Sequence, residues 1–369
     1  MSFSQMDISL VAVLTDSTRN GERLVGLGFH SNGRYSQSSI IERRLAPRLL
    51  SAGADQLGNP EAGLRLDPVR AWSVMMTNEK QGGHGDRAVA VSALDMALFD
   101  LAAKDEGMPL WRWLDAHYGT GNAHERVPVY ATGGYYSDGK GLGQLRDEVA
   151  SLLELGYEKV KIKIGGLPIA DDIARVEAAL EVLARDGARL AVDANASLDP
   201  HRALSYASAL ANYDLLWFEE PCDPLDFETY ARIAEQYPAP IATGENIMSL
   251  SDAKNLLRYA GLRRDRDVLQ VDPNLCYGFV EYMRILDFLR EVDWPLERCI
   301  PHGGHLGSLH AAAAFGLAGT EVMPGHFEPV GGLLDETVVT NGTVASPRLP
   351  GVGIEGKKEL LAQYDDMLD

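Results

Sequence analysis

The chain has 369 residues, 46% of them hydrophobic, which is enough for one α/β barrel of about 200–250 residues plus a smaller domain. Its formal charge is −19, with 34 Lys and Arg against 53 Asp and Glu. This balance argues against nucleic acid or an anionic membrane as a partner, because both attract basic surfaces. A small anionic substrate would need local cations or a metal ion at its site.

The chain has three cysteines, Cys222, Cys276 and Cys299. They are far apart and form no C-x-x-C pair, so we expect packed thiols in a reducing compartment and neither disulfides nor a zinc site. Residues 1–10 lack the basic and apolar regions of a signal peptide. The most apolar stretch, residues 306–323, is interrupted by polar residues and predicts a helix and a strand, not a membrane span. We therefore expect a cytoplasmic protein.

The first 125 residues predict strands followed by helices. Residues 7–35 alternate in the manner of antiparallel strands around a turn at Asn20-Gly21, which can supply positive φ. Helices are predicted at 40–50, 68–76 and 87–104. The segment 78–87, N-E-K-Q-G-G-H-G-D-R, predicts a polar loop that contains Lys80. This order indicates a separate α+β domain over residues 1–125.

From Arg126 the pattern changes to alternating strands and helices. Eight strands are predicted, at 128–132, 159–164, 189–194, 215–219, 239–244, 268–272, 298–301 and 320–323. Seven helices fit the gaps, at 143–155, 169–185, 200–211, 225–236, 249–260, 278–291 and 306–317. Such a repeat predicts a parallel sheet, and we expect a TIM-type (β/α)7β barrel over residues 126–330. Residues 331–369 are expected to return to the first domain as a C-terminal tail.

Six polar residues recur along this region at intervals of 30, 26, 26, 27 and 30 residues: Lys163, Asp193, Glu219, Glu245, Asp272 and His302. Each one ends or follows a short run rich in β-branched or aromatic residues. The carboxyl ends of barrel strands lie on one face, where active sites occur. The six side chains are therefore expected to converge on one pocket.

Lys161 and Lys163 are two residues apart on a predicted strand, so they share one face. Val160, Ile162 and Ile164 take the opposite face, which places both lysines inside the barrel. Burial and a neighbouring cation each disfavour an ammonium group, so we expect at least one lysine to act as a base near neutral pH. The alternative is a pair of solvent-facing or ion-paired lysines.

Asp193, Glu219 and Glu245 would project from three successive strand ends. Converging carboxylates repel one another unless a positive charge lies between them, and oxygen ligands favour Mg²⁺ first and Mn²⁺ second. The alternative is three unrelated surface or helix-capping acids.

Asp272 and His302 lie on the next two predicted strands. A carboxylate beside an imidazole fixes its tautomer and raises its basicity, which suits an acid–base catalyst. The glycines of P-H-G-G-H are expected to leave room for a ligand. Five further residues are candidates for substrate binding: Lys80, Asn195, Asn246, His305 and Glu321. Turn-forming, structural or solvated side chains are the alternative for these five.

The K-x-K pair, the Asp-Glu-Glu triplet and the Asp-His couple resemble the enolase superfamily, in its mandelate racemase-like branch. Within that branch, W-F-E-E-P-x-D-P-L-D, A-T-G-E-N and C-I-P-H-G-G-H are similar to the D-tartrate dehydratases. The resemblance extends over essentially the whole chain, including the tail segment N-G-T-V-A-S-P-R-L-P-G-V-G-I-E.

The resemblance implies a role for each residue that matches the family pattern. The implied magnesium ligands are Asp193, Glu219 and Glu245. Lys163 would abstract the proton next to the substrate carboxylate, and Lys161 would lower its pKa. His302, held by Asp272, would protonate the departing hydroxyl. Lys80 matches a lysine that the capping domain contributes in these dehydratases.

The implied function is a magnesium-dependent dehydratase of a hydroxy-acid, first of all D-tartrate to oxaloacetate and water. The reaction would pass through a metal-stabilised enediolate and then eliminate the β-hydroxide. Another acid-sugar dehydratase, a racemase or an epimerase fits the same pattern, and a non-catalytic binding protein is a remote alternative. The expected partner is a small anionic hydroxy-acid, and the chain is expected to form a homo-oligomer.

Overall fold

The computed structural model describes residues 6–368; residues 1–5, part of the segment checked for a signal peptide, and Asp369 lie outside that range. It begins with an antiparallel hairpin of β1 (Leu10–Arg19) and β2 (Glu22–Phe29). Both turn residues have positive φ, +54° at Asn20 and +87° at Gly21, which suits the right-handed twist of the two strands. The predicted antiparallel pair is confirmed.

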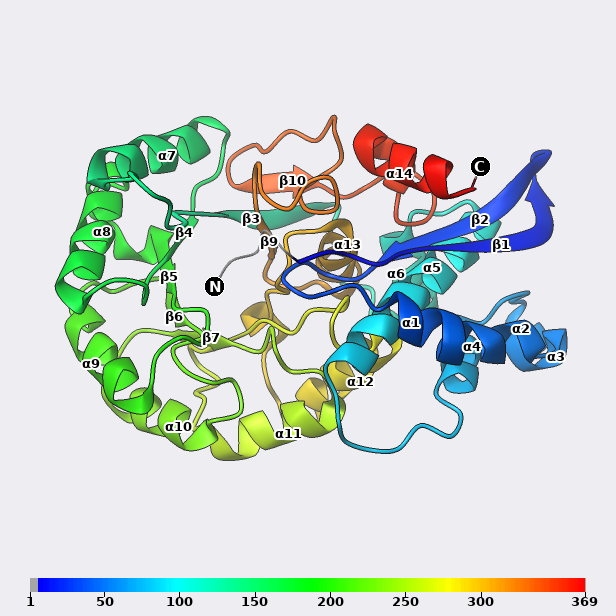
Figure 1. The fold of residues 1–369 in the computed structure, drawn as a ribbon, viewed down its shortest axis with the longest axis horizontal. Coiled ribbons are helices and arrows are strands. Elements are labelled where there is room, and N and C mark those ends of the chain that lie inside the picture. Colours follow the sequence, from blue (N-terminus) through cyan, green and yellow to red (C-terminus); the bar gives the residue numbers. More distant parts are fainter. Residues whose placement is uncertain (1–5, 369) are drawn as a thin grey trace.

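The hairpin packs on a group of helices that spans residues 38–118 (Figure 1). These are α1 (Ser38–Ile40), a π-helical turn (Ile41–Leu45), α2 (Ala46–Ser51), α3 (Ala54–Leu57), α4 (Pro68–Met75), α5 (Asp86–Glu106) and α6 (Leu110–Tyr118). Helix α5 is buried along most of its length, and its Asp100 Oδ2 accepts a hydrogen bond from Leu27 N at 2.8 Å. The sequence prediction missed α6, although four of its apolar residues are buried at helical spacing.

The centre of the molecule is a parallel sheet. Its strands are β3 (Arg126–Gly133), β4 (Val160–Lys163), β5 (Leu190–Asp193), β6 (Trp217–Glu219), β7 (Ile241–Thr243), β8 (Val268–Leu269) and β9 (Thr320–Val322). Strands β3 to β8 pair in chain order, and β9 pairs with the other edge of β3. The predicted α/β organisation with parallel strands is confirmed.

Seven helices lie between these strands in the described part of the chain, one in each interval except the last, which contains two. They are α7 (Leu142–Glu154), α8 (Ile169–Val182), α9 (Pro200–Leu210), α10 (Phe227–Gln236), α11 (Leu250–Tyr259), α12 (Gly278–Glu291) and α13 (Leu306–Phe315). Helices α7 to α11 form an arc around the outside of the sheet (Figure 1). Successive side chains of each strand therefore point alternately toward these helices and toward the opposite face of the sheet. A small cluster of Tyr130, Ala191, Trp217, Ala242 and Val268, from five different strands, packs separately from the main core.

The prediction of a strand over residues 298–301 is wrong, because only one residue of this segment forms a β-bridge. Only Cys299 forms a parallel bridge, to Leu269 of β8, and Cys299 O accepts a hydrogen bond from Ala318 N at 3.2 Å. A 3-10 turn (Leu296–Arg298) precedes this position. Pro301 follows it and has no N–H to extend the ladder. The segment nevertheless lies between β8 and β9 and carries His302 to the end of the sheet.

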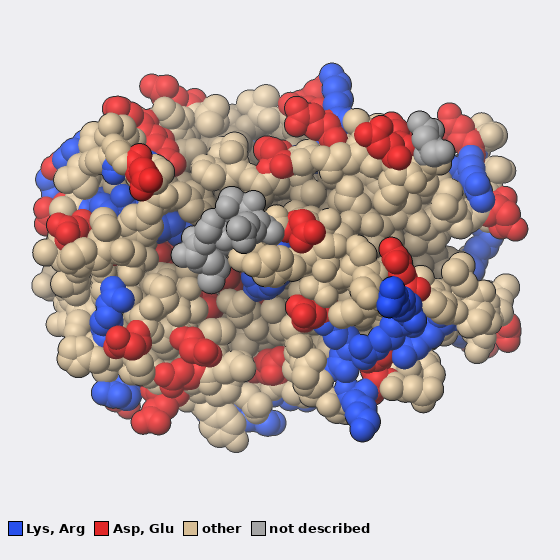
Figure 2. All heavy atoms as spheres, in the orientation of Figure 1, with Lys and Arg blue, Asp and Glu red and all other residues tan. Residues whose placement is uncertain are grey.

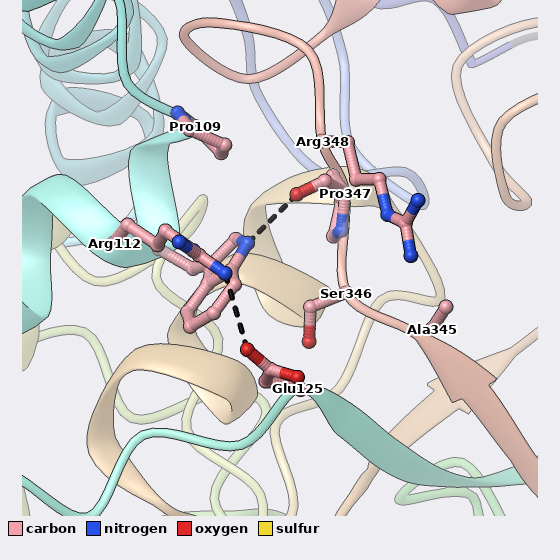
Figure 3. Close-up of a pocket in the computed structure, with 8 residues that line it drawn as sticks. Pro109, Arg112, Glu125, Ala345, Ser346, Pro347 and Arg348 are labelled. Carbon is pink, nitrogen blue, oxygen red and sulfur yellow. Dashed lines mark hydrogen bonds and ion pairs between the residues drawn. The ribbon is translucent and has the colours of Figure 1, made fainter.

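The tail contacts both the sheet and the N-terminal part of the chain. Strand β10 (Thr343–Ala345) pairs antiparallel with β3, and Trp111 Nε1 of α6 donates to Pro347 O at 2.7 Å (Figure 3). Helix α14 (Lys358–Leu368) places the Tyr364 hydroxyl 2.6 Å from Gly28 O. The tail thus fastens the hairpin and α6 to the first strand of the sheet.

Charge is spread unevenly over the surface. On the face shown in Figure 2, acidic side chains are scattered, and the largest group of basic side chains lies over the region of α1 and α12. Within residues 6–368, no helix is long and apolar enough to cross a membrane.

Candidate active site

The register of the sheet brings the first three predicted residues to one level. Lys163 is paired with Asp193 across β4 and β5, and Asp193 with Glu219 across β5 and β6. Each is the last residue of its strand, as predicted, and all three are buried. Asn195 follows in the left-handed region, with φ +45°, where asparagine is tolerated, and its N–H donates to Asp193 Oδ1 at 2.7 Å.

Both lysines of β4 form buried ion pairs with these carboxylates. Lys163 Nζ lies 2.6 Å from Asp193 Oδ2. Lys161 Nζ contacts Glu219 Oε1 and lies 2.9 Å from Glu321 Oε1 and 3.5 Å from Asp193 Oδ2. The lysines are therefore buried, as expected, and do not lie on a solvent-facing edge. The other alternative, that they are ion-paired, is confirmed.

The expected lowering of the lysine pKa is wrong for this arrangement. Burial alone would lower the pKa of Lys163, but Asp193 and other nearby groups outweigh it and raise the pKa above its usual range. The pKa of Lys161 is also raised, because Glu219, Glu321 and Asp193 outweigh its burial. Both lysines are thus ammonium ions in this arrangement.

The carboxylates carry more negative charge than their own cations stabilise. Burial, together with Asp193, Glu321 and Glu245, raises the pKa of Glu219 to about 8, although Lys161 acts in the opposite direction. All the donors in this set are oxygens, which suits a hard divalent cation such as Mg²⁺. Among residues 6–368, no three His, Cys, Asp or Glu side chains are already assembled around a metal position. The donor chemistry of this set thus fits magnesium.

Glu245 and Asn246 follow β7. Glu245 Oε2 lies 3.5 Å from His302 Nε2, and Asn246 Nδ2 donates to Glu245 Oε1 at 3.2 Å. Asn246 Nδ2 also lies 3.2 Å from Glu220 Oε2, a buried carboxylate. Glu245 is therefore oriented by an amide on one side and an imidazole on the other.

Asp272 joins two histidines. Its Oδ2 lies 3.1 Å from His302 Nδ1, and its Oδ1 lies 3.2 Å from His305 Nε2. Burial would lower the pKa of His302, but Glu245, Asp272 and Glu321 together raise it to about 9. His302 is therefore protonated at neutral pH and carries an N–H on Nε2, the nitrogen that does not face Asp272.

Gly303 makes room for protein atoms, which corrects the expectation that these glycines leave room for a ligand. A Cβ at Gly303 would lie 2.5 Å from both Asp272 Oδ2 and His305 Nε2, and the residue has φ +105°. At Gly304, a Cβ would meet Met323 at 3.0 Å. The P-H-G-G-H motif thus packs the two histidines around Asp272.

We predict that Gly303→Ala lowers the turnover rate by at least about 100-fold, because a small misplacement of catalytic groups reduces a reaction rate by about that factor. The Cβ must displace Asp272 or His305 and therefore His302. Gly325→Ala is a matched control, because Gly325 also has positive φ, +70°, but open space around its Cβ position. Steady-state kinetics and thermal unfolding should show a loss of activity in the first variant well beyond that in the second. Equal losses would contradict the packing role.

A cavity of about 180 Å³ unites part of the predicted set. Its wall includes Lys163, Asn195, Glu245, Asn246 and His302. Residues that the sequence prediction did not single out also line it, among them Asn32, Arg34, Tyr135, Met323 and Phe327. The cavity shown in Figure 3, between α6 and residues 345–348, contains none of the predicted site residues.

Seven predicted residues are not part of the cavity wall: the exposed Lys80, and six buried residues behind the wall, Lys161, Asp193, Glu219, Asp272, His305 and Glu321. Asp193, Glu219, Glu321 and His305 are buried and reach the site through their contacts with Lys161, Lys163 and Asp272. Lys80 is exposed, is not part of the cavity wall, and has no side-chain hydrogen bond or ion pair within residues 6–368. Its backbone O accepts from Arg87 Nη1 at 2.7 Å. A role for Lys80 stays a prediction.

Comparison with known proteins identifies the family. Residues 144–360, more than half of the chain, match the family model described as enolase C-terminal domain-like. The arabinonate dehydratase of Saccharolobus solfataricus is 31% identical over 300 residues, which cover 79% of this chain and 77% of that protein. The L-talarate/galactarate dehydratase of Salmonella typhimurium is 28% identical over 334 residues, which cover 90% and 77% of the two chains.

Solved structures agree with this assignment. A structure described as a racemase from Streptomyces coelicolor with bound magnesium is 27% identical, with a TM-score of 0.75, and the match covers 95% of this chain and 93% of that one. An L-talarate dehydratase from a Polaromonas species, in complex with magnesium and L-glucarate, has a TM-score of 0.70 at 26% identity and covers 94% and 89%. The buried lysine pair, the carboxylates and the aspartate–histidine pair at the strand ends thus lie in a chain that belongs to the enolase and mandelate racemase superfamily.

Proposed function

We propose that the protein is a magnesium-dependent dehydratase of an acid sugar, and that D-tartrate, converted to oxaloacetate and water, is the first substrate to test. One observation carries the proposal: Lys163 and His302 line the same small cavity together with Glu245. Two groups that can exchange protons on one substrate are what the loss of water requires. Relatives named as acid-sugar dehydratases support the reaction class.

In the proposed reaction, Lys163 takes the proton from the carbon next to the substrate carboxylate. The electron pair left on that carbon delocalises into the carboxylate as an enediolate. In the second step this electron pair forms a double bond to the neighbouring carbon as the C–O bond of that carbon breaks. His302 gives the proton on Nε2 to the departing hydroxyl, which leaves as water. The resulting enol takes up a proton and becomes the 2-keto acid.

The remaining residues hold these two groups in place. Asp272 orients His302 through Nδ1, and Lys161 holds the side chains of Glu219 and Glu321 in place through its contacts with both. We assign the metal to Asp193, Glu219 and Glu245, with Lys163 released from Asp193 in the working site. When bound, Mg²⁺ would supply positive charge against the substrate carboxylate. Asn195 and Asn246 are the proposed contacts of substrate hydroxyls, whereas His305 is assigned to Asp272.

We propose the same domain division as the family resemblance implies. Residues 1–125 would form an α+β capping domain, residues 126–330 the (β/α)7β barrel, and residues 331–369 a tail that returns to the cap. Ser31 N and Asn274 O, 3.2 Å apart, are one of the contacts that support a cap over the strand ends.

A racemase or cycloisomerase is the second candidate. A relative from Streptomyces coelicolor, 29% identical over 356 residues that cover 95% of this chain and 90% of that protein, is a 3,6-anhydro-alpha-L-galactonate cycloisomerase. Proton abstraction by Lys163 is common to both reactions, and only dehydration then expels a hydroxyl. The two are therefore told apart by their products.

The test is a screen of four- to six-carbon acid sugars, including all three tartrates, in the presence of Mg²⁺. The proposal predicts a 2-keto acid from at least one of them, and oxaloacetate from D-tartrate, detected by semicarbazide absorbance and proton NMR. Epimerised acid without any keto product would instead establish the racemase of the second candidate.

A further inference from the structure

The segment that precedes α1 brings a cation into the cavity wall. Asn32 Nδ2 donates to Gly303 O at 2.8 Å, and Ser31 N lies 3.2 Å from Asn274 O. These bonds fasten the segment to the loops that carry Asp272 and His302. Two residues further on, Arg34 lines the same cavity as Lys163 and His302.

Arg34 is paired only with neutral acceptors. Its Nη1 donates to Gly33 O at 2.7 Å, and its Nη2 to Asn246 Oδ1 at 2.5 Å. Within residues 6–368 it makes no ion pair, in contrast to Lys163, whose partner is Asp193. A guanidinium has five N–H donors, so several remain for a ligand. Arg34 is thus a partly buried cation at the cavity wall, and the described chain supplies no counter-ion for it.

The cavity wall carries two kinds of groups. Lys163, His302 and Glu245 are the reacting groups, which take the carboxylate and the α-carbon under the proposed function. The Arg34 guanidinium, which Asn246 holds, is a planar donor fork that matches a carboxylate in two parallel hydrogen bonds. A hydroxymethyl group at that position would leave the guanidinium without a counter-charge.

We propose that Arg34 binds the second carboxylate of a short dicarboxylic acid sugar, so that diacids are the preferred substrates. This inference rests on the proposed function for the orientation of the substrate. The cavity of about 180 Å³ suits a short ligand, since sites for drug-sized ligands measure about 300–1,000 Å³. The relatives leave the choice open, because arabinonate is a monoacid and galactarate a diacid.

The test compares Arg34→Gln with the wild type on length-matched acids. We expect kcat/KM for D-tartrate to fall about 10- to 100-fold, the usual loss for a hydrogen-bonded charge, and kcat/KM for the monoacid D-threonate to change much less. Arg34→Lys, which keeps the charge but not the fork, should lie between. Equal losses on both acids, or a wild type that prefers the monoacid, would overturn the assignment.

A binding measurement separates this inference from the proposed reaction. Succinate is a diacid that has no hydroxyl to lose, and butyrate is its monoacid match. Calorimetry should show weaker succinate binding to Arg34→Gln, by about 10-fold or more, and similar butyrate binding to both proteins. Absence of turnover in the wild type with this pattern intact would reject the dehydratase and keep Arg34 as the diacid site, whereas equal succinate binding would reject Arg34.

Two further variants test whether the preference for diacids depends on the position of the cation that is removed. Arg43→Gln removes an exposed arginine outside the cavity wall, and Lys80→Gln removes the lysine that the family resemblance favours. We expect neither to change the ratio of diacid to monoacid activity. A loss of diacid preference in Lys80→Gln alone would transfer the role from Arg34 to the 78–87 loop. Thermal unfolding of each variant confirms that it is folded.

Discussion

Removal of divalent cations should abolish turnover, with a loss of at least about 1,000-fold, and Mg²⁺ should restore it. The reason is the charge of the site. The Asp193, Glu219, Glu245 and Glu321 carboxylates crowd a buried region in which the pKa of Glu219 is already raised to about 8 by burial and its neighbours. Proton loss next to a carboxylate adds negative charge there, and a metal ion offsets several kcal/mol of that cost. Mn²⁺ should restore activity less well than Mg²⁺.

A second measurement detects metal binding and does not depend on turnover. Ligand binding to the folded state raises the free energy of unfolding, by about 2.7 kcal/mol at 100 times Kd. Mg²⁺ should therefore raise the thermal unfolding temperature of the wild type and have little effect on that of Glu219→Gln. Glu42→Gln is the matched control, because Glu42 is exposed and outside the cavity wall. Full activity in protein shown by elemental analysis to be metal-free would contradict the magnesium assignment.

Part of the sheet was predictable because β4, β5 and β6 are short, buried and ended by a polar residue. Lys163, Asp193 and Glu219 end β4, β5 and β6 as their spacing predicts. The interval between these polar residues reflects the combined length of one strand, one helix and two loops, which chain geometry limits. It does not indicate over how many residues a segment forms hydrogen bonds with the neighbouring strands. Residues 298–301 satisfied the spacing, but a 3-10 turn and Pro301 restrict them to a single bridge.

The electrostatics of the lysine pair were not predictable from β4 alone. Two adjacent buried lysines predict lowered pKa values when only burial and mutual repulsion are counted. The register of the neighbouring strands decides whether the lysine pKa values are raised or lowered, because it places Asp193 and Glu219 directly beside Lys163 and Lys161. The direction of the pKa shifts therefore depends on contacts between residues 30 to 58 positions apart in the sequence.

Arg34 was missed for a different reason. It lies before the periodic region, in a segment with no repeat, and its place in the cavity depends on hydrogen bonds to residues more than 240 positions away, such as Asn274 and Gly303. The sequence did offer one signal, an arginine among small polar residues directly after β2. Lys80 was favoured instead because it matches a lysine of the family that the chain resembles, and the structure places it on the surface.

The division of roles between Lys163 and His302 is the central claim, and hydrogen exchange tests it most directly. D-Tartrate is incubated in D₂O with Mg²⁺ and with wild type, Lys163→Ala or His302→Asn, and the recovered acid is examined by proton NMR. His302→Asn keeps a hydrogen-bonding side chain but has no transferable proton, so dehydration should fall by at least about 100-fold while the α-hydrogen still exchanges. Lys163→Ala should show neither reaction. Exchange by Lys163→Ala, together with no exchange by His302→Asn, would make the histidine the base and contradict the account.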